Sequence, residues 1–146
     1  MRVALDAARS AITSGDIPVG SAIFNSSGEI VSIGHNEREL HQDPTAHAEI
    51  VAIRRAAEKL GNWHLTDHTL VVTLEPCAMC AGAIAQSRLQ TVVFGAWDEK
   101  AGAAGSVWDL LRDPRSTFKT EVRAGVLADE CSALIKSFIQ EVRKKD

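Results

Sequence analysis

The sequence is poor in cysteine and has no long apolar run. Its 146 residues include only three cysteines, and this odd, sparse number argues against a disulfide framework and predicts a reducing cytoplasm. No stretch approaches the roughly 20 apolar residues of a membrane span, so no membrane partner is expected. Arg2 and Asp6 introduce charge too early for the apolar region of a signal peptide.

The chain also lacks an excess of positive charge. Its 16 lysines and arginines are outnumbered by 19 aspartates and glutamates, which gives a formal net charge of −3. A protein that coats nucleic acid by neutralising phosphates is therefore not expected. No repeat, low-complexity tract or linker interrupts the sequence, and 45% of the residues are hydrophobic. Residues 1–146 are expected to form a single domain.

Two short clusters carry the residues with distinctive chemistry. His47 and Glu49 are separated by one residue, and Cys77 and Cys80 follow directly after Pro76. The cysteines are three positions apart, so they share one face of a helix that begins near the proline. The N-terminus of a helix also stabilises a thiolate, which is the form of cysteine that binds a metal ion.

Together the clusters supply one imidazole, two thiols and one carboxylate. His47, Cys77 and Cys80 provide three ligands for one Zn²⁺ and leave a fourth position open, as in catalytic zinc sites. Glu49 is about 200° around a helix from His47, which is a poor placement for a second ligand, so we expect it to carry protons. The pattern H-x-E…P-C-x-x-C is the known signature of zinc nucleobase deaminases.

Two other interpretations of the cysteine pair stay open at this point. A C-x-x-C pair also forms redox centres, although that motif usually accompanies a thioredoxin-like βαβ unit and needs no distant H-x-E. Alternatively, the zinc is purely structural and takes a fourth protein ligand. The candidates for that ligand are Cys131, His35, His41, His64 and His68. Cys131 falls on the apolar stripe of a predicted helix, which favours a position in the core.

Hydrophobic spacing predicts four helices and five strands. The first helix is expected to end at Gly15, and the other three are expected to cover about 47–60, 77–88 and 127–142. The strands are expected at 19–24, 29–33, 69–74, 91–94 and 118–123. A hairpin followed by strand–helix–strand crossovers predicts a mixed α/β sheet with helices on both faces. Ligands of open α/β sheets bind at the carboxyl ends of strands, which is where we expect both clusters.

The motifs extend well beyond the two clusters, and together they resemble the bacterial tRNA-specific adenosine deaminases. The matching segments are 16–20, 43–49, 74–83, 93–96 and 102–106, with Asn36 and Asp98 between them. The zinc motif alone also fits cytidine, deoxycytidylate, guanine and pterin-type deaminases. The run Asp43–Glu49 and the loop Gly102–Ser106 are the more selective part of the resemblance.

The resemblance implies a cytidine-deaminase-like fold, which is a three-layer α/β/α sandwich around a mixed five-stranded sheet. It implies a homodimer with one zinc ion per chain that converts the wobble adenosine of an arginine tRNA to inosine. The partner is then a tRNA anticodon stem-loop, because a base in a single-stranded loop leaves its stack at the lowest cost.

The resemblance also adds three expected substrate contacts. Asn36 and the backbone of Ala48 are expected to contact the flipped nucleotide, and Asp98 the sugars or flanking bases. Without the resemblance, Asn36 is equally typical of a turn residue, and Asp98 is typical of a solvated loop charge. Trp97 departs from the family pattern, which often has a basic residue at this position.

Two alternative functions are kept for comparison. A free-base or nucleoside deaminase, above all a guanine deaminase, would use the same zinc and the same Glu49 but would need no RNA contacts. A non-catalytic, zinc-stabilised RNA-binding module would need a fourth protein ligand on the metal. Activity on free guanine would identify the first alternative, and four protein ligands on zinc would identify the second.

Overall fold

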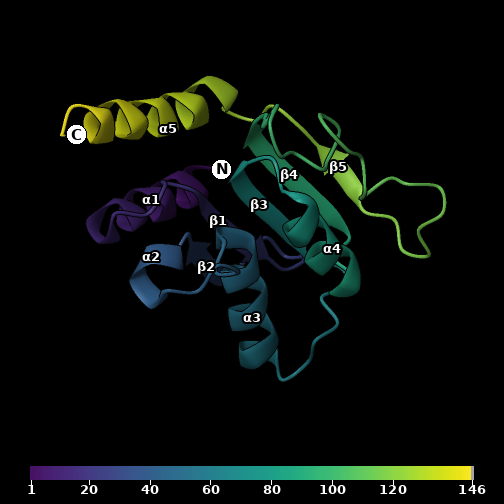
Figure 1. The fold of residues 1–146 in the computed structure, drawn as a ribbon. Coiled ribbons are helices and arrows are strands. Elements are labelled where there is room, and N and C mark those ends of the chain that lie inside the picture. The colour runs from purple at the N-terminus through teal and green to yellow at the C-terminus, as the bar shows by residue number, and fades with distance from the viewer. Residues whose placement is uncertain (146) are drawn as a thin grey trace.

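A mixed five-stranded sheet forms the centre of the molecule (Figure 1). The computed structural model describes residues 1–145, so Asp146, the last residue of the expected domain, lies outside the described residues. The strands are β1 (Gly20–Phe24), β2 (Ile30–His35), β3 (Thr69–Leu74), β4 (Thr91–Ala96) and β5 (Glu121–Arg123). They lie in the order β2-β1-β3-β4-β5. Strand β1 is antiparallel to both of its neighbours, whereas β3, β4 and β5 are parallel.

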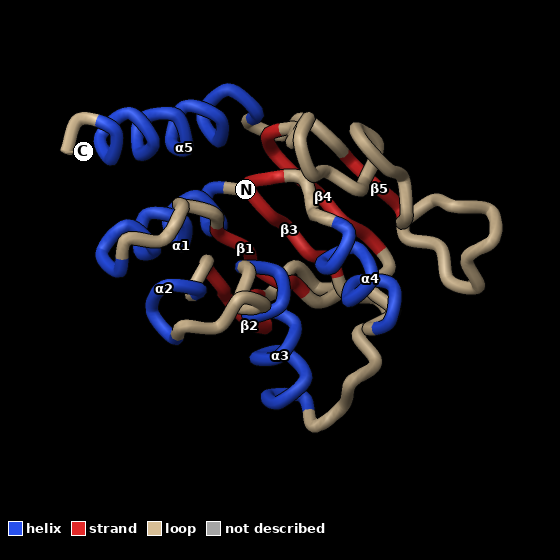
Figure 2. Tube along the Cα trace, in the orientation of Figure 1, coloured by secondary structure: helices blue, strands red, loops and turns tan. Residues whose placement is uncertain are grey.

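Helices cover both faces of this sheet (Figure 2). The main helices are α1 (Arg2–Ala11), α3 (Ala48–Leu60), α4 (Ala78–Gln86) and α5 (Ala128–Arg143). Gly20 of β1 faces α1 and Gly95 of β4 faces α5, because a Cβ at either glycine would collide with that helix. The next residue of β1, Ser21, faces the opposite side and donates a hydrogen bond of 2.7 Å to the carbonyl of Ala48 in α3. The expected three-layer α/β/α sandwich is confirmed.

Small residues hold α3 close to the sheet. Ala48, Ala52 and Ala56 are fully buried and recur at every fourth position, so they form one stripe along the helix. Gly34 of β2 permits a close backbone approach, because a Cβ there would collide with the backbone of Ala48 and Ala52. The start of α3 is therefore fixed against β1 and β2, and the residues of the first cluster are fixed with it.

Most of the predicted elements are confirmed, with changes at their ends. The first helix continues through a short 3₁₀ turn and ends at the left-handed Gly15, and α3 ends at the left-handed Gly61. Strand β5 has three residues and is shorter than the predicted strand at 118–123. The short helix α2 (Arg38–His41) was not predicted, because four residues are too few for an apolar period. Among residues 1–145, no helix has the length and apolar character needed to cross a membrane.

Candidate metal centre and catalytic cavity

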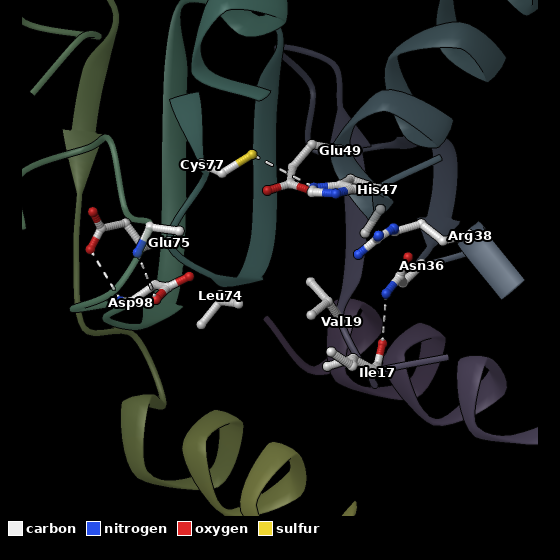
Figure 3. A pocket seen from close by; sticks show the side chains of 12 residues that line it. Ile17, Val19, Asn36, Arg38, His47, Glu49, Leu74, Glu75, Cys77 and Asp98 are labelled. Atoms are coloured by element: carbon white, nitrogen blue, oxygen red, sulfur yellow. Dashed lines mark hydrogen bonds between the residues drawn. The ribbon is translucent and has the colours of Figure 1, made fainter. Parts of the chain in front are cut away.

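The two clusters stand at two helix starts that face each other. His47 is the N-cap residue of α3, and Cys77 is the N-cap residue of α4, which follows β3. Both have extended backbone, with ψ angles of 155° and 176°. Figure 3 shows the Cys77 sulfur directed at the His47 imidazole. The helix that was predicted to begin at Cys77 in fact begins at Ala78, so only Cys80 of the pair lies within the helix.

The three ligand atoms have the spacing of a zinc site. His47 Nδ1 lies 3.6 Å from the sulfur of Cys77 and 3.5 Å from the sulfur of Cys80. All three atoms lie within 4.8 Å of one another. A tetrahedral zinc ion, with a Zn–N distance of about 2.0–2.1 Å and a Zn–S distance of about 2.3 Å, separates nitrogen from sulfur by about 3.6 Å. The residues present therefore fit the expected zinc ion, and residues 1–145 contain one such group.

The group contains no fourth protein ligand among the residues that the structure describes. Cys131 is buried on the opposite face of the sheet, where it packs against Gly95. The other candidates for a fourth ligand also lie outside the group; they are His35, His41, His64 and His68. A three-ligand site with an open fourth position is the arrangement of catalytic zinc, whereas structural zinc sites are closed by four ligands.

Electrostatics within the cluster favour cation binding. A hydrogen bond from the Cys80 thiol, with His47 as a further partner, lowers the pKa of Cys77 to about 3. The contact with Cys77, together with deep burial, raises the pKa of Cys80. The hydrogen bond with Cys77 also raises the pKa of His47. The lowered pKa of Cys77 favours its thiolate, which is the form of cysteine that binds a metal ion.

Glu49 lies in the first turn of α3 and is buried, with only 4% of its surface exposed. It lines the same cavity as His47 and Cys77 (Figure 3), but it does not belong to the group of metal-ligand atoms. Burial raises the pKa of Glu49 to about 7. A buried carboxyl group with a raised pKa, next to the ligand group, is suited to accept and donate protons.

The cavity in front of these residues has a volume of about 150 Å³, and its walls include all three residues expected to contact the substrate: Asn36, Ala48 and Asp98. Asn36 is 8% exposed, and its Nδ2 donates a hydrogen bond of 3.3 Å to the carbonyl of Ile17. Its Oδ1 is buried and has no hydrogen-bond partner among the described residues. A buried acceptor without a partner in a cavity wall is suited to receive a donor from a ligand.

Two further residues of the cavity wall were not predicted from the sequence. Arg38 comes from the unpredicted helix α2 and lies beside Asn36 in Figure 3. Glu75 is 2% exposed and accepts hydrogen bonds from the backbone N–H groups of Asp98, Ala104 and Ser106, at 3.1–3.3 Å, and from the Ser106 hydroxyl at 2.8 Å. These partners are 23–31 residues away in the chain, so no local pattern could have indicated them.

The fold and the three-ligand site define a zinc-dependent deaminase of the cytidine-deaminase-like class. Residues 1–96 match the family model described as the cytidine and deoxycytidylate deaminase zinc-binding region. The tRNA-specific adenosine deaminase of Bacillus subtilis (strain 168) is 45% identical over 145 residues, which cover 99% of this chain and 89% of that protein. The chain belongs to the tRNA-specific adenosine deaminase family.

Solved structures agree with this assignment. A structure from a study of A-to-I editing by tRNA:A34 deaminases at the wobble position superposes with a TM-score of 0.88 at 36% identity, covering 92% of this chain and 96% of that chain. The guanine deaminase of Nitrosomonas europaea superposes with a TM-score of 0.79 at 26% identity, covering 92% of this chain and 80% of that chain. The same framework therefore occurs with two different substrates.

Proposed function

We propose that this protein hydrolytically deaminates the wobble adenosine to inosine in the anticodon loop of a tRNA, specifically an arginine tRNA. The observation that carries the proposal is the buried Glu49 beside a three-ligand zinc site, in a cavity walled by Asn36 and Asp98. Family membership supports adenosine in tRNA as the substrate class. We also propose a cytoplasmic location, which the sparse, odd number of cysteines supports.

The proposed chemistry uses Glu49 as the proton carrier. Zinc, when bound, supplies the Lewis acidity that makes a water molecule acidic near neutral pH. Glu49 accepts a proton from the attacking water and transfers it to the purine ring nitrogen as water adds to C6. Glu49 then helps to deliver a proton to the departing amine, so that ammonia leaves and inosine remains. Burial of Glu49 keeps bulk water from competing for these protons.

The cavity wall supplies the proposed contacts to the flipped nucleotide. The unpartnered Oδ1 of Asn36 is an acceptor for a donor on the nucleotide. The backbone N–H of Ala48 is a donor at the start of α3, where helical N–H groups have no partner within the helix. Asp98 is proposed to contact the sugars or flanking bases. Arg38 lines the same cavity, and its positive charge is proposed to bind the phosphate of a neighbouring nucleotide.

We further propose that the active form is a homodimer whose partner chain completes the RNA-binding groove. A chain of 146 residues is small for holding a whole anticodon stem-loop. It also exposes a run of large apolar side chains, Val107, Trp108 and Leu110, that a partner surface would cover. Sedimentation at micromolar concentration should give about twice the chain mass. A strict monomer with full activity on tRNA would refute the dimer but not the deamination.

The second candidate function is guanine deamination, because a guanine deaminase shares this fold at 26% identity. Ammonia release and inosine formation should be measured on an anticodon stem-loop with adenosine at the wobble position, on free adenosine and adenine, and on cytidine and guanine. The stem-loop is expected to be by far the best substrate, because flipped bases are recognised together with their flanking nucleotides. Rapid deamination of guanine with an inert stem-loop would establish the alternative.

A further inference from the structure

A second hollow adjoins the catalytic cavity, and we call it the side groove. It has a volume of about 590 Å³ and lies between residues 97–100 on one side and Ser132, Ile135, Lys136 and Ile139 of α5 on the other. Ile17, Leu74 and Asp98 line both the side groove and the catalytic cavity. Figure 3 shows these three residues along one edge of the cavity. A chain that leaves the catalytic cavity over this edge enters the side groove directly.

Trp97 is the aromatic residue of this groove, and its position is fixed on several sides. It follows directly after β4, and its ring meets the buried Phe94 edge-on, with centroids 4.9 Å apart at an angle of 85°. On another side the ring lies against Gly105, where a Cβ would approach it to 3.2 Å. Even so, Trp97 is 49% exposed. The indole is thus held in place while about half of its surface faces solvent.

The backbone that follows Trp97 is held as firmly as the ring. The N–H of Asp98 donates to the buried Glu75 at 3.3 Å, and the carbonyl of Asp98 lies 2.7 Å from the Ser106 hydroxyl, whose single proton it shares with Glu75. The charged side chains that line the groove are of both signs, Lys100 and Lys136 together with Asp98 and Glu99. Exposed aromatic rings on which bases stack are the sequence-tolerant part of sites for single-stranded nucleic acid.

We propose that Trp97 is a stacking platform for the base next to the deaminated adenosine, an inference that rests on the proposed RNA substrate. When one nucleotide of a loop is flipped into the catalytic cavity, its neighbour loses a stacking partner. The indole of Trp97, in the groove that adjoins this cavity, replaces the lost stacking. Because the ring is already ordered, little conformational entropy is lost on binding.

The test compares protein variants on RNAs that lack one base. The RNAs are an anticodon stem-loop with adenosine at the wobble position, and the same stem-loop with an abasic residue on the 5′ or the 3′ side of that adenosine. The zinc-loaded proteins are wild type, Trp97→Leu, Trp97→Phe and, as a matched control, Trp63→Leu. Trp63 is 56% exposed and lines neither hollow. Equilibrium Kd and the single-turnover rate of inosine formation are both measured.

On the intact stem-loop, Trp97→Leu is expected to raise Kd by roughly 5- to 150-fold, the range that base–aromatic stacking spans. Trp97→Phe keeps an aromatic face and should bind nearly as wild type does, as should Trp63→Leu. On one of the two abasic RNAs, wild type and Trp97→Leu should bind equally, because the base that Trp97 would stack on is missing.

Three results would overturn the proposal. If Trp97→Leu weakens binding to the intact and to both abasic RNAs by the same factor, Trp97 only supports the loop. If Trp97→Leu binds every RNA as wild type does, no base stacks on it. If the variant instead changes the sedimentation of the protein alone, the exposed indole is a protein contact. Failure of wild type to form inosine in the intact stem-loop counts against the proposed function, and the binding comparison still decides the role of Trp97.

Discussion

The two sides of the catalytic cavity are built in different ways. On the metal side, His47, Cys77 and Cys80 stand at or just inside two helix starts that are fixed by packing against the sheet. On the opposite side, the segment 97–106 has no regular helix or strand and is held in part by hydrogen bonds to the buried carboxylate of Glu75. The metal side holds the residues suited to the chemistry, and the loop side contributes Asp98 to the wall of the same cavity.

This difference has a physical cause. Zinc requires particular ligand types at fixed distances, which helix N-cap geometry supplies with little freedom. A substrate as large as an RNA loop is recognised by several side chains spread over a surface, and each contributes modestly. Removing a residue from the metal side should therefore abolish function, whereas removing one from the loop side should weaken it.

The largest effect is expected for the removal of a buried ligand. Cys80→Ala should lose both zinc and all measurable turnover, because two ligands do not hold the metal in place. Metal analysis after dialysis and an assay for ammonia release measure the two outcomes. Cys131→Ala is the matched control, since this cysteine is also buried but lies outside the ligand group. Loss of zinc from the control, or full zinc in Cys80→Ala, would contradict the assigned ligand set.

The second effect separates a proton carrier from a ligand. Glu49→Gln keeps the shape of the side chain but does not exchange protons as a carboxylate does. Turnover should fall by at least about 100-fold, the low end of general acid–base contributions, while zinc content and Tm remain near those of wild type. Stoichiometric loss of zinc would show that Glu49 is a ligand, and retention of most activity would disprove its role as the proton carrier.

On the loop side, Glu75→Gln is expected to destabilise the segment 97–106 without removing zinc. The amide replaces one acceptor oxygen with a donor, so at least one N–H group of the loop loses its partner. The free energy of unfolding should fall by about 1–3 kcal/mol, which lowers Tm by several degrees. Affinity for the stem-loop should fall as well. Glu58→Gln, on the exposed surface of α3, is the matched control and should change neither quantity.

The smallest effect is expected at Asn36. Asn36→Ala removes the unpartnered Oδ1, so kcat/KM on the stem-loop should fall by roughly two- to tenfold. This factor corresponds to the net free energy of about one neutral hydrogen bond. Thermal stability should change little, because the lost bond to Ile17 is offset by removal of a buried oxygen that has no partner. A large fall in Tm with unchanged kcat/KM would show that Asn36 serves the fold and not the substrate.

The same division explains what the sequence could predict. Periodic apolar residues located α3, Pro76 and the cysteine pair located α4, and short apolar runs located the strands, each to within a few residues. Glycines marked the ends of two helices. The three candidate zinc ligands were predictable because they belong to the compact pattern H-x-E…P-C-x-x-C, in which Cys77 and Cys80 are three positions apart at one helix start. The roles of Glu75 and Arg38 were not predictable, because they depend on contacts between distant segments and on a four-residue helix without an apolar period.

The central claim is that the metal side and the loop side together select adenosine in the anticodon loop. The most direct test is sequencing of a tRNA pool after incubation with the zinc-loaded protein, with Glu49→Gln as the inactive control. Inosine is expected at the wobble position of arginine tRNA with wild type only, and at no other adenosine. The contradicting result is a protein that carries one zinc ion per chain and rapidly deaminates free guanine, but leaves the tRNA unmodified.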